Sequence, residues 1–305
     1  MSLKRYLDEI GDNSKRLVSS KLANLSGLSP EELRLFLEAW AGMDIERRRQ
    51  IASQLVELAE ENCKLNFDDI FLACLDDPDE IVRVKSIEGL WECESRSLID
   101  RLIALLREDS KELVRAAATL ALGKFAMLAE LEELRPEDGA KVENVLLAVI
   151  DDDEKMIEVK RRAIEAIAPL SRPRVKEIIQ QAYESDDVRM RVSAIYAMGR
   201  NSDPAWLPTL LRELGSTDAE IRFEAAVACG ELGEEGAVPY LLRLIDDLDS
   251  QVQLSAIAAL GQIAGSEAEA ALRECLNHPN EHIRQAAGEA VEGLLFDRDP
   301  LSFGF

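Results

Sequence analysis

The sequence has few aromatic residues, no long apolar run and no cysteine motif. Aromatics make up 5% of the 305 residues although 47% are hydrophobic, a balance typical of a helical array. No run of about 18 apolar residues is present, so no membrane-spanning helix is predicted. The opening residues lack the apolar core of a secretory signal, and the five Cys residues include no CxxC pair. Reduced thiols and a cytoplasmic location are therefore expected.

Basic residues and histidines are also scarce. The chain has 36 basic and 59 acidic residues, a net charge of −23, which would repel a phosphate backbone and argues against nucleic-acid binding. Of the two histidines, His278 and His282 have the spacing of metal ligands, but Pro279 separates them and no third ligand is evident. No Gly-rich phosphate loop or nucleophile elbow occurs. We therefore predict no catalytic residue, no metal and no cofactor.

What the sequence does contain is an internal repeat. The segments Asp187 to Gly199, Asp218 to Gly230 and Asp249 to Gly261 align without a gap in steps of 31 residues (218 − 187 and 249 − 218). Such self-similarity is typical of a solenoid. Each Asp is placed to cap the N-terminus of a helix, and each Gly is expected to end that helix in a left-handed cap. A second helix per repeat is predicted near Pro208 and Pro239.

The motif Asp-x-x-[aliphatic]-Arg-x-x-Ala-x-x-Ala-[aliphatic]-Gly resembles the short bacterial HEAT-like repeat, of the type also found in phycobilin lyase subunits. The resemblance implies an all-α fold, a right-handed α-α superhelix, that is, a HEAT-repeat α-solenoid. HEAT-like deoxyhypusine hydroxylases bind metal through His-Glu dipeptides, and this sequence has none. The repeat extends through most of the chain when it is aligned on its Arg position, which holds Arg83, Arg115, Lys160, Arg191, Arg222, Gln253 and Arg284.

Three segments are expected from this alignment. Residues 1–25 form an N-terminal arm, expected to be loosely held. Residues 26–295 form a solenoid of about eight helical pairs, with an atypical cap over 26–66 that starts at a Ser29/Glu32 capping box and an insertion near 128–141. Residues 296–305 form a tail with three Phe residues, expected to dock on the final repeat.

The resemblance also implies that the second helix of each repeat lines a concave face. Positions one and five residues after the Arg position share a side of that helix, and three consecutive repeats carry only apolar or aromatic residues there. The predicted protein-binding residues are Val192, Tyr196, Phe223, Val227 and Leu254, with Glu224 and Arg161 beside them. The alternative is that these side chains fill the grooves between repeats.

The predicted function is a non-catalytic scaffold or adaptor that binds another protein. Because the chain is strongly acidic, the partner is expected to have a basic surface, with no nucleic acid and no membrane involved. The alternative function is a bilin-lyase-like enzyme subunit or another protein that binds a bulky ligand on the concave face.

Overall fold

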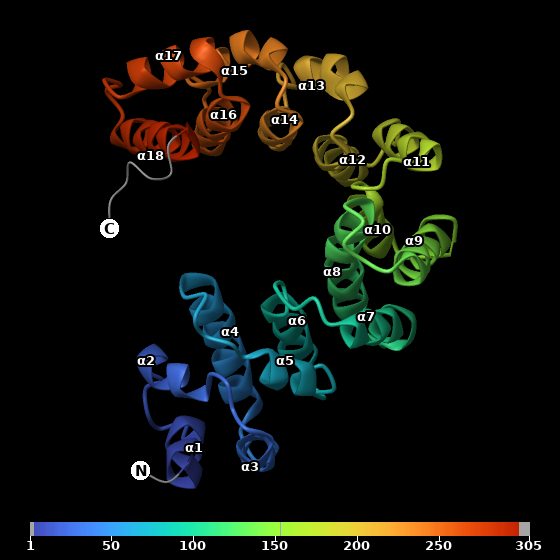
Figure 1. Cartoon of the computed structure of the whole chain (residues 1–305), viewed down its shortest axis with the longest axis vertical. Helices are drawn as coiled ribbons and strands as arrows, with labels where there is room; N and C mark the ends of the chain where they lie inside the picture. The colour runs from blue at the N-terminus through green and yellow to red at the C-terminus, as the bar shows by residue number, and fades with distance from the viewer. Residues whose placement is uncertain (1–2, 153, 299–305) are drawn as a thin grey trace. The chain divides into compact units, whose positions relative to one another are not determined.

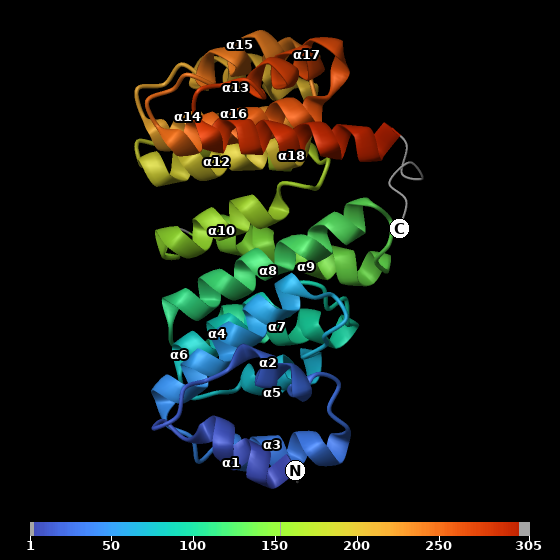
Figure 2. The same ribbon diagram turned by 90° about the vertical axis from the view of Figure 1, so that its left-hand side faces the viewer.

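The computed structural model describes residues 3–152 and 154–298, with side chains described up to residue 294. The described residues form helices joined by short turns, and no strand occurs among them. The chain divides into two compact units at the junction of Ala166 and Ile167, and each unit is described by itself (Figures 1 and 2). The all-α class expected from the repeat is confirmed.

The first unit begins with α1 (Leu3–Gly11), which packs on α3 (Pro30–Trp40). A row of longer helices follows, in which α6 (Glu80–Gly89) packs on both α4 (Ile45–Glu61) and α8 (Glu112–Glu130). The remaining elements of this unit are α2 (Ser19–Leu22), η1 (Ala23–Leu25), α5 (Asp68–Cys74), α7 (Arg96–Glu108), α9 (Pro136–Ile150) and α10 (Ile157–Ile167), whose last residue begins the second unit.

The second unit consists of two layers. The even row comprises α12 (Val188–Asn201), α14 (Ala219–Leu232), α16 (Ser250–Ile263) and α18 (Glu281–Arg298), each packed on the next. The odd row comprises α11 (Pro173–Tyr183), α13 (Leu207–Glu213), α15 (Val238–Leu244) and α17 (Gly265–Cys275), each packed on the even helix that follows it in the chain. The turns before α13 and α15 are η2 (Pro204–Trp206) and η3 (Glu235–Ala237). Figure 1 shows the two layers in yellow to red.

The predicted helix starts are confirmed by their hydrogen bonds. Asp187, Asp218 and Asp249 each accept from a backbone N–H in the first turn of the helix that they precede. The Ser29/Glu32 capping box is present. Short acceptor side chains therefore satisfy backbone donors that the helix itself leaves unpaired.

The predicted helix ends are wrong, and the reason lies in packing. Gly199, Gly230 and Gly261 lie inside α12, α14 and α16 rather than after them. A Cβ at Gly199 would lie 2.7 Å from Ala228 Cα on the next even-row helix, and one at Gly230 would lie 2.9 Å from Ala259 Cα. The glycines thus allow neighbouring helices to approach closely, while the left-handed positions fall later, for example at Gly233.

The N-terminal segment packs against the rest of the first unit more extensively than predicted. Tyr6, Leu7 and Ile10 on α1 are buried, as are Leu22 and Leu25. The prediction of a loosely held arm is therefore wrong for residues 3–25. The apolar spacing within 3–10 is typical of a packed helix, whereas the basic residues around it are typical of an exposed arm.

The insertion near 128–141 forms the last turn of α8, a short loop and the first turn of α9. It therefore lengthens two helices around one turn, in which Glu132 has a φ of 59°. The predicted tail over 296–305 begins inside α18, which ends at Arg298. The expected docking of its Phe side chains lies outside the described residues.

In two of the repeats, the Arg of the motif ties the repeat to the following turn. Arg222 donates from Nε and Nη2 to the Asp247 carboxylate, both at 2.8 Å, and from Nη1 to the backbone oxygen of Ser216 at 2.9 Å. Arg83 makes the same bidentate pair with Asp109. Two parallel charged hydrogen bonds fix geometry as well as adding stability. Arg83 and Arg222 are therefore structural residues.

Replacing Asp247 with Asn tests this pair through its pH dependence. The Arg222 guanidinium lowers the pKa of Asp247, so the pair stabilises the fold above the unfolded pKa of about 4 and loses this effect as pH falls through the lower folded pKa. We expect Asp247→Asn to lower the free energy of unfolding by about 1–2 kcal/mol at pH 7 and by less at pH 3. Urea unfolding at both pH values measures this. An equal loss at pH 3 and pH 7 would contradict the assignment.

Candidate protein-binding surfaces

Four of the predicted binding residues of the second unit, together with Ala258, form an apolar strip along the even row. Tyr196 on α12, Phe223 and Val227 on α14, and Leu254 and Ala258 on α16 occupy matching repeat positions, and these five residues are called the apolar strip below. Because α12 packs on α14 and α14 on α16, matching positions lie on the same side of the row. Ala258 is exposed and the other four are half-buried. The strip is therefore partly open to solvent.

The other three predicted binding residues, Val192, Glu224 and Arg161, have different surroundings. Val192 is only 5% exposed, so it packs in the core and the expectation that it forms part of an open surface is wrong. Glu224 is half-buried next to Phe223. Arg161 lies on α10 in the first unit, where its Nη1 donates to Glu158 at 2.6 Å. Its place beside the strip remains a prediction.

The strip leads into a groove at its C-terminal end. Leu254 and Ala258 on α16 face Ala286 and Ala290 on α18 across a groove of about 530 Å³. Glu289, which is exposed, also lines this groove. Small side chains on α18 keep the groove open, because Ala leaves space that a larger side chain would fill. The result is an apolar groove with one exposed carboxylate, that of Glu289.

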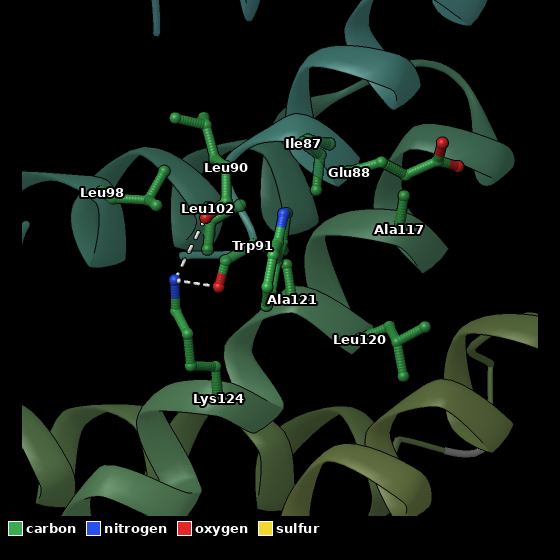
Figure 3. A pocket seen from close by; sticks show the side chains of 10 residues that line it. All are labelled: Ile87, Glu88, Leu90, Trp91, Leu98, Leu102, Ala117, Leu120, Ala121 and Lys124. Atoms are coloured by element: carbon green, nitrogen blue, oxygen red, sulfur yellow. Dashed lines mark hydrogen bonds between the residues drawn. The ribbon is translucent and has the colours of Figure 1, made fainter. Parts of the chain in front are cut away.

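A second apolar recess lies in the first unit, and sequence reasoning missed its main residue. This recess, the Trp91 cleft, has a volume of about 230 Å³. Trp91 follows α6, Leu98 and Leu102 come from α7, and Leu120 and Lys124 come from α8 (Figure 3). Trp91 is 52% exposed and Leu120 is 40% exposed. Two large apolar side chains are thus presented to solvent on one recess.

Trp91 differs from the other tryptophans in its surroundings. Trp40 and Trp206 are buried, and their indole N–H groups donate to Asp77 and Asn201 at 2.8 and 3.0 Å. Within the described part of the chain, the indole N–H of Trp91 makes no hydrogen bond. Both the ring face and the donor are therefore available to another molecule.

The position of Trp91 in the repeat explains the cleft. Trp91 lies eight residues after Arg83, an offset at which four of the six other repeats have Gly (Gly123, Gly199, Gly230 and Gly261) and the remaining two have Ala168 and Glu292. At that offset even a Cβ is close to the next helix, so an indole cannot pack there. Instead α6 ends at Gly89, and the ring lies at the surface. This break in the repeat is the sequence signal that would have located the cleft.

Lys124 lines one side of the cleft, and its ammonium donors are all used by backbone carbonyls. Its Nζ donates to the backbone oxygens of Leu90, Trp91 and Cys93 at 3.1, 3.0 and 2.5 Å, and Figure 3 shows the side chain directed at the first two. These carbonyls follow the end of α6, where a cation is favourable. Burial lowers the pKa of Lys124. All three ammonium donors have an acceptor.

The border of the cleft is acidic. Glu88 lines it and pairs with Lys85 at 2.6 Å, and Glu92 and Glu94 are exposed in the turn that follows Trp91. Both Glu92 and Glu94 lie near enough to Lys124 to act on its pKa. Three carboxylates (Glu88, Glu92 and Glu94) are set against two ammonium groups (Lys85 and Lys124), so the net charge around the cleft is negative.

The cysteines of the described residues are free, and Cys74, Cys93, Cys229 and Cys275 are buried. Burial raises the pKa of Cys74 and Cys229 to about 12, so both remain thiols at neutral pH. Cys229 is therefore a thiol of the core. Among the residues that the structure describes, no three His, Cys, Asp or Glu side chains gather in a metal-binding group, and none of the helices there is sufficiently long and apolar to cross a membrane.

Similar folds are found among solved structures. The complex of CpcE and CpcF of phycocyanin lyase from Nostoc sp. PCC7120 is similar with a TM-score of 0.56 and 16% identity, over 93% of this chain and 97% of that chain. Human deoxyhypusine hydroxylase in complex with glycerol gives a TM-score of 0.38 and 19% identity, over 96% and 97% of the two chains. At such identities the likeness concerns the fold alone. No curated protein sequence matches significantly.

The repeat motif is matched by a family model. The model for HEAT repeats matches residues 69–168, 175–251 and 243–295, which together cover well over half of the chain and include the Arg positions from Arg83 to Arg284. The resemblance inferred from the motif is therefore confirmed, and the chain belongs to the HEAT-repeat family.

Proposed function

We propose that this HEAT-repeat protein is a non-catalytic scaffold that binds another protein through the apolar strip. The observation that supports this most is the partial exposure of Tyr196, Phe223, Val227 and Leu254 at matching positions on three packed helices. Large apolar side chains gathered on a surface are typical of binding sites rather than of a free monomer surface. Aromatic residues in such a setting often carry much of the binding energy.

A partner with a basic surface fits this chain best. The net charge of −23 attracts basic proteins and speeds their encounter. One exposed acidic residue, Glu289, lines the groove at the end of the strip. A basic partner would therefore gain from charge at the border and from apolar contact at the centre.

The role of charge gives a prediction for kinetics. We expect the association rate with the partner to fall about tenfold or more between 20 mM and 500 mM salt, because the Debye length shortens and steering weakens. The dissociation rate should change much less, since apolar contacts are less sensitive to salt. Stopped-flow or surface plasmon measurements at several salt concentrations check this. An association rate independent of salt would exclude a steered basic partner.

Replacing Phe223 with Ser tests the binding role. Because Phe223 is only half-buried, the variant should lose less stability than the roughly 3–5 kcal/mol lost when a fully buried Phe is truncated. Its affinity for the partner should fall at least about tenfold. Thermal melts and quantitative capture from a native lysate measure both effects.

Two controls bracket this result. Phe125→Ser removes a ring that is 0% exposed and should show the full loss of stability. Tyr240→Ser removes an exposed aromatic from α15 in the odd row and should retain the partner. A stable Phe223→Ser variant that captures the same proteins as the unchanged chain would end the proposal.

The second candidate function is binding of a bulky ligand, as in a bilin lyase subunit. The similarity of the fold to that of the CpcE and CpcF complex supports considering this second function, although a fold alone does not establish an activity. An absorbance spectrum of the purified chain with and without a linear tetrapyrrole tests it. A saturable spectral shift that is lost in Phe223→Ser would favour the ligand over a protein partner.

A further inference from the structure

The Trp91 cleft has the features of a site that receives one large apolar side chain. Its volume of about 230 Å³ is below the 300–1,000 Å³ usual for pockets that enclose a drug-sized molecule. Its walls are apolar, with Leu98, Leu102 and Leu120 facing the recess. A single Leu, Phe or Met side chain fits this space better than a tetrapyrrole or another extended ligand.

The available polar groups indicate what lies beside that side chain. The indole N–H of Trp91 is free to donate within the described part of the chain, which suits a backbone carbonyl of an entering segment. The ammonium of Lys124 has all its donors occupied by carbonyls, so it offers no site for an anion. The exposed carboxylates of Glu92 and Glu94 favour Lys or Arg next to the apolar residue.

We propose that the Trp91 cleft binds a basic protein segment, with one large apolar side chain seated against Trp91 and Leu120 and a neighbouring Lys or Arg facing Glu92 and Glu94. The site deepens the proposed scaffold function, on which it rests, by adding a second point of contact in the first unit. Binding at two points on one chain raises overall affinity when a partner can reach both.

Selection from a random 12-residue peptide display library on the full-length protein tests this directly. We expect the enriched peptides to share a large apolar residue flanked by Lys or Arg. Their dissociation constants should rise at least about tenfold in Trp91→Ser and in Leu120→Ser, the loss usual for residues at the centre of an interface. Leu113→Ser is the matched control, because Leu113 is 50% exposed on the same helix and does not line the cleft.

The charged border has its own control. The double variant Glu92→Gln/Glu94→Gln should weaken the same peptides several-fold at low salt and leave peptides that lack Lys and Arg unaffected. Tryptophan emission should shift on peptide binding in the unchanged chain and remain constant in Trp91→Phe.

Three results would overturn the proposal: peptides that bind Leu120→Ser as well as the unchanged chain, enriched peptides that are acidic or lack a large apolar residue, or a linear tetrapyrrole that competes with the peptides at micromolar concentration. These results are separate from a failure of the scaffold function. If Phe223→Ser captures every partner while cleft-dependent peptides are found, only the apolar strip is wrong. If capture depends on Phe223 and no peptide depends on Leu120, only the cleft is wrong.

Discussion

Replacing Asp77 with Ala is expected to lower the free energy of unfolding by about 3–5 kcal/mol, because it breaks a buried charge cluster. Asp77 accepts from the indole N–H of Trp40 at 2.8 Å and from the backbone N–H of Asp79 at 2.9 Å. Arg48 lies 3.5 Å away, and the two side chains are 8% and 2% exposed. The variant would leave a buried guanidinium and a buried indole donor without their acceptor. Urea unfolding at pH 7 measures the loss.

The adjacent carboxylate is the matched control. Asp76 pairs with Arg101 at 2.7 Å, but its side chain is 75% exposed, and exposed pairs contribute about 0–1 kcal/mol. Asp76→Ala should therefore have little effect. Equal losses for Asp76→Ala and Asp77→Ala would show that the buried cluster does not stabilise the fold.

Replacing Gly199 with Ala is expected to cost about 1–3 kcal/mol through overpacking. The added methyl would lie 2.7 Å from Ala228 Cα and 3.0 Å from Ala228 Cβ. The first of these atoms belongs to the backbone of α14, so the helix itself must move. Thermal melts of the full chain detect the change, with loss of cooperativity if the two helices separate locally.

A Gly→Ala substitution at Gly293 should have the opposite effect on stability. Gly293 lies inside α18, and a Cβ there would meet no atom within 4 Å. Ala in an open helix position is favoured over Gly by about 0.5–1 kcal/mol, so Gly293→Ala should raise the melting temperature. If Ala stabilised the chain at both positions, Gly199 would be an open helix position like Gly293 rather than a close contact with α14.

The repeat predicted the fold because its signals are local. An Asp at a helix start or a Pro in a first turn acts within a few residues, so Asp218 and Pro208 could be assigned from the sequence. The role of Gly199 could not, because the same residue suits a left-handed cap and a close helix contact. Only the position of Ala228 on the next helix distinguishes the two.

In the candidate sites too, features set by the local sequence could be predicted, and features set by a neighbouring helix could not. Matching repeat positions correctly placed Tyr196 and Phe223 on packed neighbouring helices, but could not show that Val192 is buried, because its exposure depends on the adjacent helix. Trp91 could not be predicted from the regular repeat positions, because it falls where its repeat departs from the common pattern. Its place at the offset of Gly199 is visible in the sequence, whereas the cleft depends on the early end of α6 at Gly89.

The central claim is that a protein partner lies on the apolar strip. Hydrogen exchange of the full chain, alone and in complex with the protein captured from a native lysate, tests it most directly. We predict slower amide exchange in α14 and α16, on the helices that carry Phe223 and Leu254, with little change in α13 and α15. Slower exchange confined to α13 and α15, or no change anywhere in the second unit, would contradict the claim.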